Sequence, residues 1–439
     1  MLLRTPEAAL GHRLSRRAAM LYFVAVTNLW TWVFFAMLVA VTATQSWLAR
    51  RQIVHVRRHR EEVPGMFAGE IPLPSHQKAA DYSIAKTHLE VTEILLGALV
   101  LLAFTLGGLI NWLDKTWEPV FGHSSLAHGV ALCASVAIVS ALVDLPVSIY
   151  RTFVVEARFG FNRMTPRLFM ADLLKQAALV ALFGIPLLFI VLWLMDAMGE
   201  LWWLYVWAVW IGFNLLVLFL FPTIIAPLFN KFTPLRDPEL AERVEGLLQR
   251  CGFRSRGLYV MDGSKRSSHG NAYFTGFGPA KRIVFFDTLL ARLTSAEVEA
   301  VLAHELGHHR LRHIWKRALL LFAASFALLW GLGQLIDQRW FYEGLGVSRP
   351  SLAAGLILFM MVVPLFFFFL QPLSSRFSRQ HEFEADAYSS AHANAVDLES
   401  ALVKLYKDNA ATLTPDPLHS AFYDSHPPAI ARLSRLAKA

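Results

Sequence analysis

Long apolar stretches dominate the pattern of hydrophobic and polar positions along the chain. Seven of them are long enough to cross the hydrocarbon core of a bilayer, which takes about 20 mostly apolar residues in a helix. They cover residues 18–43, 91–112, 126–147, 173–195, 201–221, 317–336 and 351–371. The pattern therefore predicts a mainly α-helical integral membrane protein with seven transmembrane helices.

Two segments of a different character interrupt this pattern. Residues 222–316 and 372–439 have mixed charges and turn-forming residues, so they are compatible with water. They divide the chain into four expected regions. These are residues 1–221 with five spans, 222–316, 317–371 with spans six and seven, and 372–439.

Short strands followed by a helix are predicted within residues 222–316. The segments RGLYVMDG (256–263), GNAYFTGFG (270–278) and IVFFDTLL (283–290) place strand-forming residues between turn residues. In the stretch that follows, Thr294 and Glu297 have the spacing of a capping box, and the aliphatic residues after them fall on one helical stripe. A small α+β region that ends in a helix is therefore expected.

The composition supports a membrane protein and changes the interpretation of the net positive charge. Of 439 residues, 55% are hydrophobic and 17% are charged, and the mean hydropathy is +0.44. The net charge of +8 comes from basic residues that lie between apolar stretches rather than in one patch. We interpret them as topology signals and contacts to lipid headgroups, and we expect no nucleic acid as a partner. The first apolar stretch exceeds the roughly 7–15 residues of a signal-peptide core, so it is interpreted as a span.

The distribution of lysine and arginine predicts an orientation. The loops after the first and third spans are rich in both residues, whereas the loop after the second has only Lys115 and the loop after the fourth has none. The two polar segments fall on the same side as the rich loops, which we predict to be cytoplasmic. The N-terminal tail, with its four arginines, favours the opposite orientation.

One short motif in the predicted helix indicates metal chemistry. In HELGH (304–308), His304 and His308 are four residues apart, so both imidazoles point to one helix face and are able to share a tetrahedral zinc. Glu305 follows at about 100° of helix rotation, from where its carboxylate reaches a zinc-bound water without binding the metal. The alternative is chance, since such a match arises with a probability on the order of a few per cent in a chain this rich in histidine. With only Cys133 and Cys251 as cysteines, any metal must be held by histidine and carboxylate.

A catalytic site of this kind needs a third ligand. Glu382 is able to complete a His2Glu set, and Asp386, one turn later, is able to accept a hydrogen bond from a ligand imidazole. The alternative is a solvated acidic helix face. Rival ligands are His309, His313 and His381, of which the first two are expected to be exposed at a basic helix end.

The chain resembles the zinc-dependent CAAX prenyl proteases, integral-membrane metalloproteases of the gluzincin type. The resemblance covers roughly residues 80–435 and rests on the order and spacing of several motifs. They are VVEARFGFNRMT (154–165), FPTIIAPLFNKFTPL (221–235), SSHGNAYFTGFG (267–278), HELGH (304–308), EFEAD (382–386) and SHPPAIARL (425–433).

The resemblance implies roles for individual residues. His304, His308 and Glu382 would hold one zinc ion, Glu305 would be the general base, and Asp386 would support a ligand. Asn271, Ala272 and Tyr273 would form an edge strand that pairs with the main chain of the substrate. His426 would stabilise the oxyanion, and Arg432 would hold the substrate near it.

The family also implies an architecture and a partner. Seven helices would enclose a chamber within the membrane, and residues 222–316 and 372–439 would form a zincin-like protease domain on the cytoplasmic side. The substrate would be a peptide or protein, either lipidated or otherwise associated with the membrane. The arginine-rich composition favours a bacterial member in the cytoplasmic membrane, and the endoplasmic reticulum is expected if the chain is eukaryotic.

Two kinds of alternative function stay open. A membrane quality-control protease without dependence on a prenyl group would use the same chemistry. From other classes, a transporter or channel would explain the spans but not the histidine motif, and a sensor-transducer would need larger outer loops than are predicted.

Overall fold

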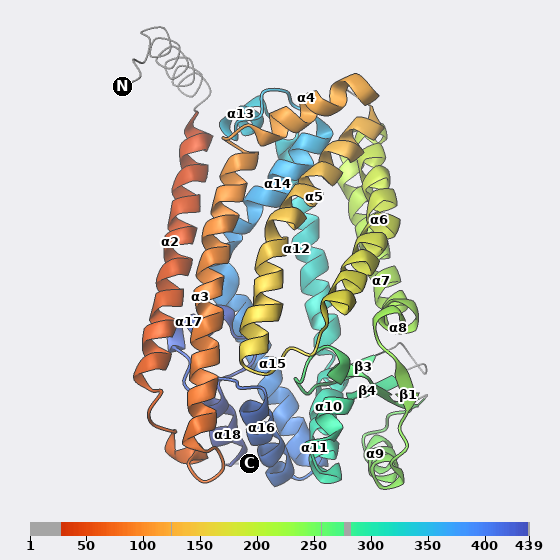
Figure 1. Ribbon diagram of the computed structural model, residues 1–439. Coiled ribbons are helices and arrows are strands. Elements are labelled where there is room, and N and C mark those ends of the chain that lie inside the picture. Colours follow the sequence, from red (N-terminus) through yellow and green to blue (C-terminus); the bar gives the residue numbers. More distant parts are fainter. Residues whose placement is uncertain (1–27, 124, 256, 276–281, 438–439) are drawn as a thin grey trace, which may run out of the picture.

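Seven helical stretches of the described residues are long and apolar enough to cross a membrane, which confirms the predicted architecture (Figure 1). The computed structural model describes residues 28–123, 125–255, 257–275 and 282–437. The stretches are Leu29–Arg58 (α2), Leu73–Phe104 (α3), Leu126–Glu156 (α5 and η2), Pro166–Ala197 (α6), Gly199–Phe229 (η3 to α8), His313–Leu335 (α12) and Leu352–His392 (α14 to α15). Within the composite stretches, the main helices are α5 (Leu126–Tyr150), α7 (Trp202–Leu220), α8 (Ala226–Phe229), α14 (Leu352–Phe367) and α15 (Gln371–His392).

The boundaries of the first two spans differ from the sequence prediction. The second predicted span, residues 91–112, continues past the end of its helix, because α3 ends at Phe104 and a separate helix, α4 (Leu109–Phe121), follows. Gly108 joins them with φ of +76°, a conformation that glycine adopts without steric cost. Hydropathy does not register this turn, since it is made of apolar and small residues. Residues 18–27 of the first predicted span lie outside the described residues.

Helices α2 and α3 are longer than a bilayer requires. Their 30 and 32 residues correspond to about 45–48 Å, against a hydrocarbon core of about 30 Å. Beyond the bilayer, α2 contacts the C-terminal part of the chain: Arg51 forms an ion pair with Asp416 at 2.9 Å, and the backbone NH of Asp416 donates to Oε1 of Gln52 at 2.7 Å. The long helices thereby attach the polar segments to the membrane region.

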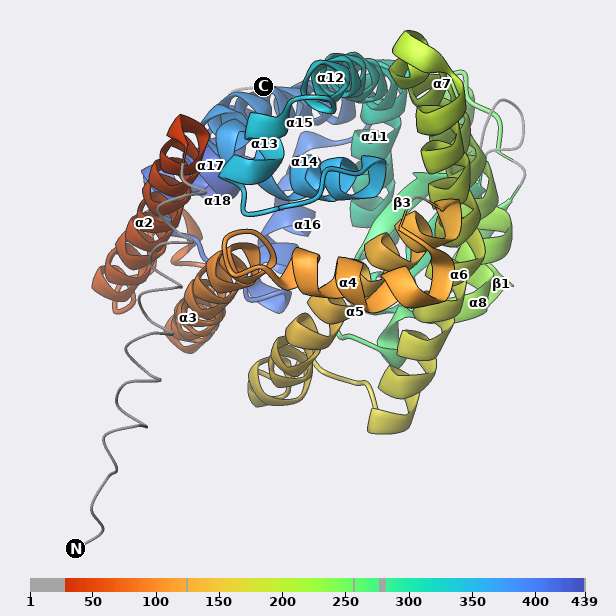
Figure 2. The same ribbon diagram turned by 90° about the horizontal axis from the view of Figure 1, so that it is seen from above.

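The spanning helices surround the segment that carries α14 when the molecule is seen from above (Figure 2). Helices α2 and α3 lie on one side, α6 and α7 on the other, and α12 and α5 lie between them (Figure 2). One apolar core joins these helices through residues such as Phe34, Leu132 and Leu358. The intramembrane chamber stays an expectation from the family resemblance.

A four-stranded sheet confirms the three predicted strands and adds one. Its strands are β1 (Phe232–Pro234), β2 (Leu258–Met261), β3 (Ala272–Thr275) and β4 (Arg282–Phe286), in the order β1-β2-β4-β3. Strands β2 and β4 are parallel, and the two outer pairs are antiparallel. β3 therefore lies at an edge of the sheet, as the resemblance implies. β1 escaped prediction because it has only three residues and ends in proline.

The predicted motif helix is α11 (Ser295–Arg310), and it packs with the sheet in a second core. The capping box is present: the Thr294 side chain accepts from the backbone of Glu297, whose carboxylate accepts from the backbone of Thr294. Burial raises the pKa of Glu297, but contacts with Lys404, Ser400 and Thr294 outweigh it and hold this pKa below its ordinary value. The start of α11 is thus tied to a neighbouring helix by a buried carboxylate. The remaining helices are α9 (Pro238–Arg250), α10 (Asp287–Leu290), α13 (Arg339–Gly344), α16 (Ala395–Asp408), α17 (Pro417–Tyr423) and α18 (Ala429–Leu436).

Candidate active site

Two helices bring two histidines and a glutamate together at the lower end of the bundle in Figure 1, in a group that could hold a metal ion. α11 carries His304 and His308, whose Nε2 atoms are 3.2 Å apart. α15 brings Glu382 against them, with carboxylate oxygens 3.5 Å from Nε2 of His304 and 3.4 Å from Nε2 of His308. His304 and Glu382 are 7% and 3% exposed. His308 is half-buried, and the two imidazoles with the carboxylate supply a donor set that suits a metal ion.

These distances fit a small divalent metal. Bonds of about 2.0–2.1 Å in a tetrahedral zinc site separate neighbouring ligand atoms by roughly 3.3–3.4 Å. The observed separations of 3.2, 3.4 and 3.5 Å lie close to that value. Burial lowers the pKa of His304, but hydrogen bonds to Asp386 and Glu382 outweigh it and raise the pKa to about 9. A metal bound by His304 would displace a proton from this imidazole, because a ligand nitrogen must be deprotonated.

Close packing of the two helices makes this cluster possible. Gly307 lies where α11 meets α15, and a methyl group added there would lie 3.0 Å from Cβ of Tyr388 and 3.1 Å from Cα of Ala385. Nearby, the Ser389 hydroxyl donates to the backbone oxygen of Ala300 at 2.8 Å. The glycine within HELGH thus sets the distance between the helix with the two histidines and the helix with Glu382.

Replacing Gly307 by alanine is expected to destabilise the protein by about 1–3 kcal/mol, the usual cost of overpacking. It should also weaken metal binding, because the added methyl group pushes against Ala385, one turn from Glu382. Thermal unfolding in detergent and metal titration measure the two effects. Gly331→Ala in α12 is the matched control, since nothing lies within 4 Å of the added methyl group. Equal stability and metal affinity in both variants would contradict the role assigned to Gly307.

Asp386 contacts the ring nitrogen of His304 that faces away from the cluster, and Arg432 contacts Asp386. Nδ1 of His304 is 2.8 Å from Oδ1 of Asp386. Arg432 donates to both oxygens of the same carboxylate, through Nε at 2.9 Å and Nη2 at 2.5 Å. Asp386 and Arg432 are 4% and 6% exposed. Asp386 thus lies against the imidazole of His304, the expected ligand, and Nε2 of His304 is turned towards the cluster.

A series of contacts through His313 and Glu384 orients His308, and the sequence analysis did not predict it. Nδ1 of His308 is 3.0 Å from Nδ1 of His313, and Nε2 of His313 is 2.9 Å from Glu384. A proton on Nε2 of His313 directed at Glu384 leaves its Nδ1 to accept from His308, so Nε2 of His308 keeps a free lone pair. His313 was expected to be exposed, but it is 1% exposed and stacks on His381 at 4.0 Å. The expectation was wrong because the short turn after α11 directs His313 back against α15.

His309 also differs from its expected exposed position. It is partly buried, and its ring packs edge-on against the rings of Phe253 and Phe274, with centroids 5.3 Å away in each case. It therefore lies on the side of α11 that faces α9 and the sheet. Neither His309 nor His381 belongs to the cluster of His304, His308 and Glu382.

Glu305 and His426 differ in burial and in their contacts. Glu305 is half-buried and has no hydrogen bond or ion pair with the residues that the structure describes. His426, in the loop between α17 and α18, approaches Glu382 with its Nδ1 2.7 Å from Oε2. Its side chain is 65% exposed, so its other ring nitrogen is available to a bound molecule.

A cavity extends from this site along α3 and α16. Its volume is about 580 Å³, and His426, Arg432, Tyr406, His269 and Lys86 are among the residues that line it. It lies next to the metal-binding cluster, so a peptide bound over the cluster has room to continue into it.

The predicted edge strand lies next to the motif helix. Ala272 and Tyr273 pair with Phe285 and Val284 of β4, and the backbone oxygen of Asn271 accepts from Phe286 at 3.0 Å. These bonds use one side of the strand. Its other side pairs with no strand among the described residues.

A multi-pass membrane protein with H-E-x-x-H on one helix and a third carboxylate from a second helix has the features of a membrane metallopeptidase. Models of two known families match the chain. The model described as CAAX prenyl protease N-terminal, five membrane helices, matches residues 52–231, and that of peptidase family M48 matches residues 234–439.

Full-length relatives agree with these matches. The chain is 34% identical to CAAX prenyl protease 1 homolog of Arabidopsis thaliana, over 84% of this chain and 89% of the relative. It is 32% identical to CAAX prenyl protease 1 of Saccharomyces cerevisiae, over 93% and 95%. The crystal structure of S. mikatae Ste24p superimposes with a TM-score of 0.86 at 32% identity, covering 93% of this chain and 99% of that one. The chain belongs to the CAAX prenyl protease 1 family of M48 metallopeptidases, which favours an enzyme over a transporter or a sensor-transducer.

Proposed function

We propose that this membrane metallopeptidase uses zinc to hydrolyse peptide bonds near the C-terminus of prenylated CAAX-type peptides or of other membrane-associated peptides. The observation that carries the proposal is the cluster of His304, His308 and Glu382, in which the separations of the ligand atoms fit one tetrahedral ion. The substrate class is supported by the names of the relatives in Arabidopsis and yeast.

In the proposed mechanism, each residue near the cluster has one task. A zinc ion held by His304, His308 and Glu382 would supply a Lewis acid and bring the pKa of water close to neutrality. Glu305 takes the proton from the attacking water and passes it to the leaving amine. Its lack of partners among the described residues supports this role, because no competing hydrogen bond has to be broken first.

His426 is proposed to stabilise the oxyanion. Its position 2.7 Å from Glu382 places it at the edge of the metal-binding cluster, and its exposure leaves a nitrogen for the substrate. Arg432 was expected to hold the substrate. Its guanidinium already donates twice to Asp386, so the contacts favour a positioning role through Asp386 and His304.

The substrate main chain is proposed to pair with the free side of β3. A peptide added as a further strand along Asn271, Ala272 and Tyr273 would exchange main-chain hydrogen bonds with the backbone groups that face away from β4, those of Ala272 among them, without regard to its side chains. Such pairing would hold an extended peptide beside α11, with its scissile bond near Glu305. Specificity would then come from the cavity and from any attached lipid.

The proposed setting follows the distribution of basic residues. The protease domain, formed by residues 222–316 and 372–439, would face the cytoplasm. Membrane lipids would surround the spans, in the cytoplasmic membrane of a bacterium or in the endoplasmic reticulum of a eukaryote. A cysteine-labelling scan that finds residues of the α9 region accessible only from outside would contradict this orientation.

Two peptides that differ only in a farnesyl group on the cysteine of a C-terminal CAAX sequence test the substrate class. The purified full-length protein in mild detergent is expected to cleave the farnesylated peptide and to lose this activity when a chelator removes the metal. Re-addition of zinc should restore it. Cleavage of both peptides at equal rates would instead favour a general membrane endopeptidase of the quality-control kind. Cleavage of neither would contradict the proposed substrate class.

A further inference from the structure

A second group of histidine and carboxylate side chains lies at the opposite end of the bundle from the active site. Asp114 belongs to α4, His123 follows the end of α4, and His128 lies in the first turn of α5. In Figure 1 these helix ends lie at the top, whereas α11 lies at the bottom. The group is therefore separate from the metallopeptidase site.

The three side chains converge on a small volume. Each offers one nitrogen or oxygen atom, and these atoms all lie within 4.8 Å of one another. Nδ1 of His123 is 3.8 Å from one oxygen of Asp114, and Nε2 of His128 is 3.4 Å from the other. This spacing is wider than in the active site, and a shift of His123, which lies in a turn, would close it.

Burial makes this group costly without a further partner. Asp114 is 6% exposed and His128 is 1% exposed. No lysine or arginine among the described residues forms an ion pair with Asp114. Nδ1 of His123 is buried and has no hydrogen-bond partner among the described residues. A buried carboxylate with no basic partner other than histidine, facing an unsatisfied imidazole nitrogen, is an environment that a cation would stabilise.

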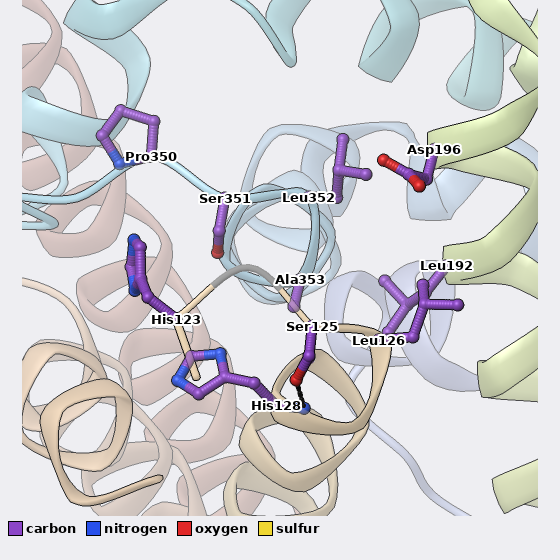
Figure 3. A pocket seen from close by; sticks show the side chains of 11 residues that line it. His123, Ser125, Leu126, His128, Leu192, Asp196, Pro350, Ser351, Leu352 and Ala353 are labelled. Carbon is purple, nitrogen blue, oxygen red and sulfur yellow. Dashed lines mark hydrogen bonds between the residues drawn. The ribbon is translucent and has the colours of Figure 1, made fainter. Parts of the chain in front are cut away.

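A pocket borders two of the three side chains. His123 and His128 line a pocket of about 190 Å³, which Figure 3 shows with Ser125 near them and Asp196 across the space. The walls come from the ends of α5 and α6 and from the residues that precede and begin α14. A metal held by the three side chains would complete its coordination with water from this pocket.

We propose that Asp114, His123 and His128 form a second metal site, which binds a divalent transition-metal ion such as zinc. Imidazole and carboxylate ligands suit this class of ion. Nε2 of His128 is 3.0 Å from the backbone oxygen of Asp114, so it donates a proton there when no metal is bound. The metal takes the place of that proton, which is released to solvent. Because α4, the turn and α5 each supply one ligand, the ion holds the α4–α5 hairpin in one arrangement.

Counting bound metal tests the site without reference to catalysis. The full-length protein is stripped with a chelator in detergent, titrated with zinc chloride, desalted, and analysed for zinc per chain by elemental mass spectrometry. The parent is expected to bind two zinc ions, and His123→Ala is expected to bind one fewer. His304→Ala should also lose one, but from the active site. His88→Ala, which removes an exposed histidine of α3, is the matched control and should keep the parent's count.

This experiment tests the two proposed metal sites independently of each other. An unchanged zinc count in His123→Ala would overturn the second site, whatever His304→Ala shows. An unchanged count in His304→Ala would contradict only the proposed catalytic zinc. Because His123 lies in a turn, peptide hydrolysis by His123→Ala should persist and report that the variant is folded. Asp114→Asn provides a second test of the same loss. If both variants keep the zinc count of the parent, Asp114, His123 and His128 form only a histidine–aspartate contact and bind no metal.

Discussion

Replacing Glu305 by glutamine is expected to lower the rate of peptide hydrolysis by about 10³–10⁴-fold, the upper part of the contribution of a positioned general base. Glutamine has the same shape, but its amide does not accept the proton from the attacking water. The change leaves no partner unpaired, because Glu305 has no hydrogen bond or ion pair with the described residues. Metal content and thermal stability should therefore stay close to those of the parent.

Hydrolysis of a fluorogenic peptide, zinc content and thermal unfolding of the same preparation measure these three properties. Glu299→Gln is the matched control on α11. Glu299 forms ion pairs with Arg243 and Arg250 of α9, whose side chains are 44% and 52% exposed, and pairs with exposed partners contribute about 0–1 kcal/mol. This control should keep its activity. Substantial hydrolysis by Glu305→Gln would contradict the assignment of the general base.

Replacing Asp386 by asparagine is expected to have the largest effect on the structure of the site. The Asp386 carboxylate lies between Arg432 and His304, with all three side chains buried. Removing one partner of a buried ion pair costs about 3–5 kcal/mol, because the other charge stays buried and unpaired. Loss of a group that orients a metal ligand lowers metal affinity by about 10–100-fold. Chemical or thermal unfolding and zinc titration measure the two losses.

A double variant separates these two effects. Adding Arg432→Met to Asp386→Asn removes the unpaired charge and keeps much of the buried volume, so part of the lost stability should return. Zinc affinity should stay low, since His304 still lacks the carboxylate at its Nδ1. The coupling free energy between the two positions is expected to be about 0.5–3 kcal/mol. Additive losses of stability would contradict the ion pair, and full recovery of zinc affinity would contradict the orienting role of Asp386.

Hydropathy was sufficient for the membrane region because the bilayer imposes its requirement locally. Every residue of a span meets the same apolar solvent, so the apolar stretch that ends at residue 336 predicts a helix with no knowledge of its neighbours. The same scale failed between α3 and α4, where Gly107 and Gly108 turn the chain among apolar residues. The turn is a property of backbone conformation, to which hydropathy is insensitive.

The histidines show which parts of the site a sequence motif predicts and which parts it does not. The i, i+4 spacing of His304 and His308 is itself a helix geometry, and the capping box at Thr294 confirms where that helix begins. Nothing in the local pattern separates His313 from an exposed residue at a helix end. Only its contact with Glu384, on a helix distant in sequence, makes it a support for His308.

The amino-acid sequence by itself determined the seven spans, the helix that carries HELGH and the strands that precede it, because each depends on interactions within a short segment. Only the tertiary structure decided that Glu382, rather than His309, His313 or His381, completes the cluster, that Arg432 is committed to Asp386, and that Asp114 meets His123 and His128. Those relations depend on how closely helices pack, which in turn depends on single contacts such as that of Gly307 with Ala385. A ligand set assembled between helices is defined by distances of a few tenths of an ångström, and side-chain packing between segments, not periodicity along one of them, sets such distances.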